Sequence, residues 1–123
     1  MKSMLELLKE QKSQTEVAIA KMKEADAAYN HHAYDVEYPS DGTVEERIAY
    51  CDKSESLREA RDAASKTAGR RLVSFGEFLG CKVEKKDIEY DWRIESRFND
   101  LKYYCERLEK TFECNVESYN QYK

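Results

Sequence analysis

The most constraining feature of this sequence is a row of apolar residues in its last third, between Asp87 and Tyr122. Its members follow one another at alternating intervals of four and three, and only Asn115 among them is clearly polar. Because an α-helix has about 3.6 residues per turn, this spacing places the row on one helical face. The row comprises Ile94, Phe98, Leu101, Cys105, Leu108, Phe112, Asn115, Tyr119 and Tyr122. It predicts a long amphipathic helix over about 88–120, with the spacing typical of a coiled coil.

Two further helices are predicted, over about 2–34 and 44–79. The first has a weaker stripe, marked by residues that recur at intervals of seven: Leu8, Thr15, Met22 and Tyr29. The core face predicted for the second helix consists of Leu57, Ala60, Ala64, Ala68, Leu72, Phe75 and Leu79. Upstream of this face, Val44, Ile48 and Cys51 form a stripe that is turned away from it by roughly a third of a turn. We therefore expect a kink or local break near residues 52–56.

Local signals mark where these helices begin and end. Pro39 and the turn dipeptide Asp41-Gly42 separate the first two helices. The segment 43–46 has the form of a capping box, in which the Thr43 hydroxyl accepts a hydrogen bond from the Glu46 amide. Gly80 suits the left-handed position that follows a helix end, and Asp87 is the predicted N-cap of the last helix.

The three helices have similar lengths and short connections, which favours an up-down-up arrangement. We therefore expect an all-α fold, an antiparallel three-helix bundle that forms a single helical domain over residues 1–123. The alternative is a helical hairpin that pairs with a second copy of the chain. The expected state is accordingly a monomer or a homodimer.

Charge and composition argue against several classes of partner. The formal net charge is −4 and the isoelectric point is about 5.3, whereas nucleic-acid-binding domains usually carry a basic patch. An antiparallel bundle would gather Arg70, Arg71, Lys82, Lys85 and Lys86 at one end, but acidic residues follow them directly. No apolar run approaches the ~18–20 residues of a membrane span. The four cysteines match no zinc pattern and suit the reducing cytoplasm, where we expect the protein.

Motifs for catalysis or cofactor binding are missing from the sequence. It contains no Gly-rich phosphate loop, no nucleophile elbow and no Glu-x-x-His motif. We therefore expect no enzymatic activity and no cofactor. His31 and Asp35 would share one helical face beside His32, but zinc needs three or four converging ligands and no third strong ligand is evident. A polar helix end is favoured over a metal site.

Two groups of residues are candidates for binding a protein. On the last helix, Trp92 lies nearly opposite the apolar row, and Tyr103 lies within about 20° of it around the helix axis, with Asn99 between them. Exposed Trp and Tyr beside Arg are typical of binding hot spots. The competing interpretation is that Trp92 packs with Ile88 under the preceding connection.

The second group lies at the turn between the first two helices, where acidic residues alternate with tyrosines. Such a turn would present negative charge to a basic partner surface. The competing interpretation is a solvated turn whose tyrosines fold back over the end of the bundle. The candidate residues of this group are Tyr34, Asp35, Glu37, Tyr38 and Asp41.

We therefore expect a non-enzymatic protein-binding module, most simply a small inhibitor or regulator that acts by surface contact with another protein. In its size, acidity and helical character the chain is similar to small regulatory proteins of phages and other mobile elements, including inhibitors of CRISPR nucleases. This likeness rests on composition and size, and no residue carries it. The alternative function is a structural bundle that self-assembles or acts as a scaffold.

Overall fold

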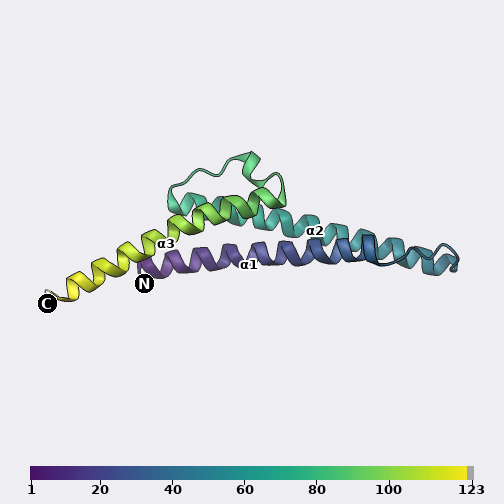
Figure 1. The fold of residues 1–123 in the computed structure, drawn as a ribbon, viewed down its shortest axis with the longest axis horizontal. Helices are drawn as coiled ribbons and strands as arrows, with labels where there is room; N and C mark the ends of the chain where they lie inside the picture. Colours follow the sequence, from purple (N-terminus) through teal and green to yellow (C-terminus); the bar gives the residue numbers. More distant parts are fainter. Residues whose placement is uncertain (122–123) are drawn as a thin grey trace.

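The computed structural model describes the backbone of residues 1–121 and the side chains of residues 1–114. Within this part of the chain there is no strand, and the all-α prediction is confirmed (Figure 1). The predicted row positions Asn115, Tyr119 and Tyr122 lie outside the described side chains. The elements are helix α1 (Met4–Asn30), the π-helical turn η1 (His31–Asp35), helix α2 (Val44–Leu79), the 3-10 turn η2 (Lys85–Ile88) and helix α3 (Asp91–Gln121).

The ends of α2 follow the local signals in the sequence. The Thr43 hydroxyl accepts a hydrogen bond from the Glu46 amide at 3.1 Å, as predicted. Gly80 has a φ of 74°, the left-handed conformation expected for the residue after a helix end. The helix runs unbroken through residues 52–56, so the expected break there is wrong. Its upstream stripe stays on the helix surface, where Val44 and Ile48 remain more than half exposed.

The predicted start of α3 is also wrong by several residues. Asp87 does not cap α3, because it belongs to the 3-10 turn η2 and its carboxylate accepts the Glu84 amide at 2.9 Å. Helix α3 begins at Asp91. Asp87 therefore stabilises the turn before the helix instead of capping the helix.

Helices α1 and α2 form a long antiparallel hairpin, and α3 runs antiparallel to α1 (Figure 1). Ion pairs between α1 and α3 show this order. Glu16 contacts Lys102 at 2.9 Å, whereas Lys12, further toward the start of α1, contacts Glu109 at 3.1 Å. In one direction along the bundle axis, residue numbers therefore rise in α1 and fall in α3.

Helix α3 is parallel to α2, which differs from the expected up-down-up order. Ser65 donates to the Asp91 carboxylate at 2.8 Å, and further along both helices the rings of Phe75 and Phe98 lie 5.9 Å apart. The three-helix bundle is confirmed, but its last helix points the other way. The chain must therefore return along α2 before α3 can begin.

Residues 80–90, which we call the return segment, make this reversal possible. Their half-buried side chains Val83 and Ile88 pack on two glycines of α2, Gly76 and Gly69. Because glycine has no side chain, the segment lies close against the helix at both places. The expected short turn is thus replaced by a strap that runs backward over α2 (Figure 1).

The apolar core lies where all three helices meet. It consists of Leu8, Ile19, Met22, Ala68, Leu72, Phe75, Leu79, Ile94, Phe98, Leu101 and Cys105. Ala60, predicted for the core, is exposed. Helix α3 covers one half of the hairpin and extends past the start of α1 (Figure 1). The other half, residues 23–67, is a two-helix arm in which His32 is the one buried residue.

Candidate functional site

The first candidate surface is the outer face of α3, which we call the aromatic face and define by Trp92, Ser96, Asn99 and Tyr103. All four residues are exposed. Trp92 is 62% exposed and Tyr103 is 65% exposed. Ile88 packs on Gly69 of α2 instead of covering the indole. The competing interpretation, in which Trp92 packs under the connection, is therefore wrong.

Neighbouring side chains hold the two aromatic rings of this face in place. The Tyr90 ring stacks on Trp92 with centroids 6.5 Å apart, and the Arg93 guanidinium lies 4.9 Å from the indole centroid. The Arg107 guanidinium lies 5.9 Å from the Tyr103 ring. Cation–π contacts of this kind are worth about 0.5–1 kcal/mol at exposed sites. The rings are thus partly ordered while their outer faces stay open to solvent.

The second candidate surface is the tip of the arm, where the five residues predicted from the sequence are all exposed. Tyr34 is 83% exposed. Tyr38 instead folds back, because its ring meets Tyr50 edge-on with centroids 5.3 Å apart. The predicted tip residues thus do not act as one group, since Tyr38 belongs to the packed surface of the arm and Tyr34 does not.

A groove at this tip contains, besides Tyr38, residues that the sequence analysis did not propose for binding. It is lined by Tyr38, Val44, Arg47, Ile48, Cys51 and Asp52, and we call it the tip groove. The signal that could have found it is the stripe of Val44, Ile48 and Cys51, which does not share the register of the core face. An apolar stripe that the core does not use must remain on the surface or meet a partner.

Beneath the tip, a buried polar cluster joins the two helices of the arm. The His32 ring is 4% exposed, and its Nε2 lies 2.7 Å from the Ser54 hydroxyl and 3.2 Å from the Tyr50 carbonyl oxygen. His31 is exposed and contacts Asp35 at 3.1 Å, on the shared face that the sequence predicts. The two histidines therefore have separate surroundings. Among the described side chains, those of residues 1–114, no group of three or more His, Cys, Asp or Glu is placed to hold a metal ion.

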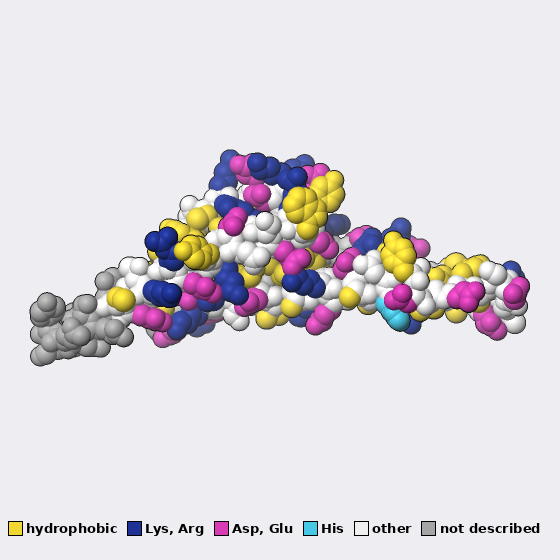
Figure 2. All heavy atoms as spheres, viewed as in Figure 1, with side chains coloured by type: hydrophobic (Ala, Val, Ile, Leu, Met, Phe, Trp, Pro, Cys, Tyr) yellow, Lys and Arg dark blue, Asp and Glu magenta, His cyan; other side chains and the backbone are white. Residues whose placement is uncertain are grey.

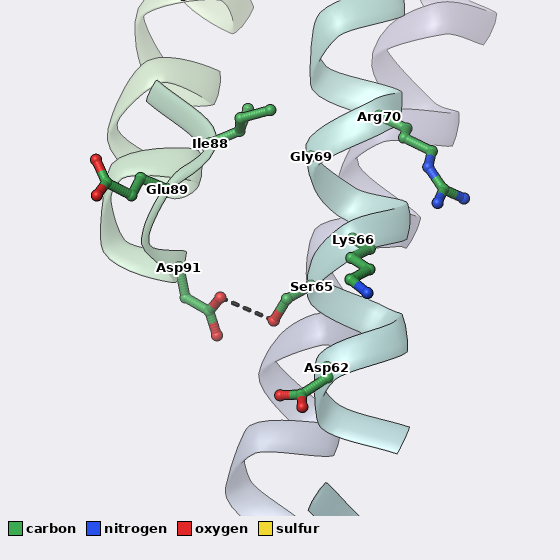
Figure 3. Close-up of a pocket in the computed structure, with 8 residues that line it drawn as sticks. All are labelled: Asp62, Ser65, Lys66, Gly69, Arg70, Ile88, Glu89 and Asp91. Carbon is green, nitrogen blue, oxygen red and sulfur yellow. Dashed lines mark hydrogen bonds between the residues drawn. The ribbon is translucent and has the colours of Figure 1, made fainter. Parts of the chain in front are cut away.

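A depression between α2 and the start of α3 has charges of both signs around it (Figure 3). Gly69 and Ile88 line its apolar part, and Ser65 bonds to Asp91 within it. Figure 3 shows Glu89 on one side and Lys66 and Arg70 on the other. The acidic and basic side chains thus point to opposite sides of the depression, and the Asp91 carboxylate already accepts a hydrogen bond from Ser65. The depression therefore favours no single class of ligand.

The basic residues predicted to gather at one end of the bundle do not do so. Lys82, Lys85 and Lys86 are exposed on the return segment, which lies over the middle of the molecule (Figure 2). Arg71 instead turns toward α1, where it bonds to Gln11 and Thr15. Figure 2 shows acidic side chains among the basic ones of this region. The reversed direction of α3 is the reason for this dispersal.

A charged cluster at the contact of α1 with α3 was also missed by sequence reasoning. Glu109 is 8% exposed and forms an ion pair with Lys12 at 3.1 Å. Burial alone would lower the pKa of Lys12, but the hydrogen bond and charge of Glu109 outweigh it and raise that pKa. Burial, assisted by Glu109, also raises the pKa of the Cys105 thiol to about 11. Cys105 is therefore a neutral, unreactive core residue at neutral pH.

Within residues 1–121, no helix has both the length and the apolar composition needed to cross a membrane. A comparison of the chain with protein-family models, with curated proteins and with solved structures finds no match in any of the three. Any functional assignment must therefore rest on the surfaces described above.

Proposed function

We propose that this protein is a non-enzymatic binding module, a small inhibitor or regulator that acts by surface contact with another protein. The observation that carries the proposal is the aromatic face. Its two large rings, Trp92 and Tyr103, are more than 60% exposed although the apolar core is complete without them. Tryptophan and tyrosine are the residue types most enriched at binding hot spots, together with arginine.

The spacing of the two rings suits a protein partner. They are eleven residues apart, which corresponds to about 16 Å along a helix and to an offset of about 20° around it. Ser96 and Asn99, which lie between them, are short polar residues that leave the rings standing above the helix surface. A partner surface of about 800 Å² would cover both rings.

The four cysteines are unpaired, which supports a cytoplasmic location for this activity. The proposal carries no catalytic step.

The test is capture of partners from the native cell by the full chain, followed by mass spectrometry of what stays bound. Trp92→Ala and Tyr103→Ala should each weaken capture of the same protein, by about thirtyfold or more for a true hot spot. Val17→Ala is the matched control, because Val17 is 50% exposed on α1, outside the aromatic face. Far-UV circular dichroism should show unchanged helicity for all three variants. A partner retained by both aromatic variants contradicts the proposal, and so does loss of folding in both.

A second candidate function, self-assembly, is favoured by the overhang of α3. Helix α2 ends at Leu79, whereas α3 continues and leaves Leu108 and Phe112 only half-buried. A second copy could cover these residues where α2 no longer does. Light scattering across a dilution series tests this, and a strict monomer at high concentration rules it out.

A further inference from the structure

The tip groove exposes several apolar side chains and is formed before any partner arrives. Val44 is 57% exposed, Ile48 is 54% exposed and Tyr38 is 43% exposed. With Cys51 they line a groove of about 420 Å³ on the first turns of α2. Figure 2 shows hydrophobic side chains gathered toward this end of the arm, with acidic ones among them.

Hydrogen bonds and ring packing hold the groove in shape. The Tyr50 hydroxyl shares its one proton between the carbonyl oxygens of His32, at 3.3 Å, and Val36, at 3.4 Å, which ties the connecting loop to α2. Tyr38 rests edge-on against the same ring. Thr43 caps the helix that carries the rest of the groove. A partner would therefore meet a preorganised surface, which lowers the cost of ordering on binding.

The charge around the groove is predominantly negative. Between Asp35 and Lys53 the chain has six acidic and two basic residues. Arg47 and Asp52 both line the groove and offset each other. The negative excess lies beside it, because Glu37, Asp41 and Glu46 line an adjoining depression that shares Tyr38 with the groove. This charge disfavours nucleic acid, whose phosphates would be repelled, and a second copy, whose tip would be equally acidic.

We propose that the tip groove binds a basic amphipathic helix of a protein partner. Apolar residues on one face of that helix enter between Tyr38, Val44 and Ile48. Its lysines and arginines meet the acidic residues around the groove. This inference rests on the proposed function as a protein-binding module. It concerns a different surface, because the tip groove and the overhang of α3 lie at opposite ends of the molecule (Figure 1). The groove also shares no residue with the aromatic face.

The probe is a fluorescently labelled peptide of roughly 18 residues, built from leucine and lysine so that the leucines form one helical face. Its control is a scrambled peptide of the same composition without that face. Fluorescence anisotropy with the full chain should show tighter binding of the amphipathic peptide. Binding should weaken with added salt, because the charges are exposed and screened over about 10 Å at 0.1 M.

Substitutions locate the site. Ile48→Ser should weaken binding about tenfold, whereas Val17→Ser, an equally exposed apolar residue elsewhere, should leave binding unchanged. Glu37→Gln combined with Asp41→Asn should weaken binding and reduce its salt dependence. Trp92→Ala should leave peptide binding unchanged.

Thiol protection gives a second readout that does not depend on substitutions. Cys51 and Cys114 are both exposed, and the peptide should slow alkylation of Cys51 in the groove but not of Cys114. Three results would each overturn the inference: no binding, equal binding of the scrambled peptide, or no protection of Cys51. If these occur while Trp92→Ala still abolishes capture of the cellular partner, the tip inference fails and the proposed function stands. If the peptide binds but Trp92→Ala has no effect on capture, the tip groove is a binding site and the aromatic face is not.

Discussion

Two glycines in α2 should respond in opposite ways to the same substitution. Glycine inside a helix costs about 1 kcal/mol relative to alanine, so Gly69→Ala and Gly76→Ala gain the same propensity. Their surroundings differ. A Cβ atom at position 69 would lie 3.4 Å from the Ile88 Cβ, an ordinary van der Waals contact. At position 76 it would lie 2.5 Å from Val83 Cγ2 and 2.8 Å from the Cys81 carbonyl oxygen.

The expected magnitudes follow from these distances. Gly69→Ala should raise the free energy of unfolding by up to about 1 kcal/mol. At Gly76 the backbone of the return segment has to move, and overpacking of this kind costs roughly 1–3 kcal/mol. After the propensity gain is subtracted, Gly76→Ala should lower the free energy of unfolding by up to about 2 kcal/mol.

Urea denaturation followed by far-UV circular dichroism measures both values on the full chain. The two variants should share one m-value, so that their midpoints report stability directly. If both substitutions stabilise the protein equally, the return segment does not lie on α2 as described. The parallel direction of α3 would then lose its structural basis. If both destabilise it, the Ile88 contact is tighter than the structure indicates.

Two other predictions concern a helix cap and a buried thiol. Thr43→Ala should lower the free energy of unfolding by about 1 kcal/mol in the same assay, because the Glu46 amide loses its acceptor, and Thr43→Ser should restore most of the loss. Cys105 has a pKa of about 11 in the fold against an ordinary value of 9.0, so its neutral thiol stabilises the fold fully below pH 9. That contribution, roughly 3 kcal/mol at most, is lost as the pH rises from 9 to 11. Denaturation across this range should therefore show a smaller alkaline loss for Cys105→Ala than for the exposed control Cys51→Ala, and equal losses would contradict the assignment.

Sequence alone determined the features that depend on near neighbours in the chain. The bounds of α2, its Thr43 cap and its Gly80 terminus follow from local backbone chemistry, which acts within one helical turn. The buried face of α3 and the position of Trp92 outside it follow from helical periodicity in the same way. Local rules suffice there because the geometry of a helix is known in advance.

Tertiary structure decided two things that helical periodicity leaves open. These are which surface each apolar stripe packs against and in which direction each helix runs relative to its neighbours. The pattern of α3 is compatible with either orientation, and the contacts of Val83 and Ile88 with Gly76 and Gly69 select the parallel one. That choice leaves half of the hairpin uncovered. It thereby converts the stripe through Ile48 from a possible core face into the exposed tip groove. It also buries Glu109 beside Lys12, a contact that the sequence analysis did not predict. The physical reason is that burial depends on which distant segments fill the space, and the spacing of residues along one helix does not contain that information.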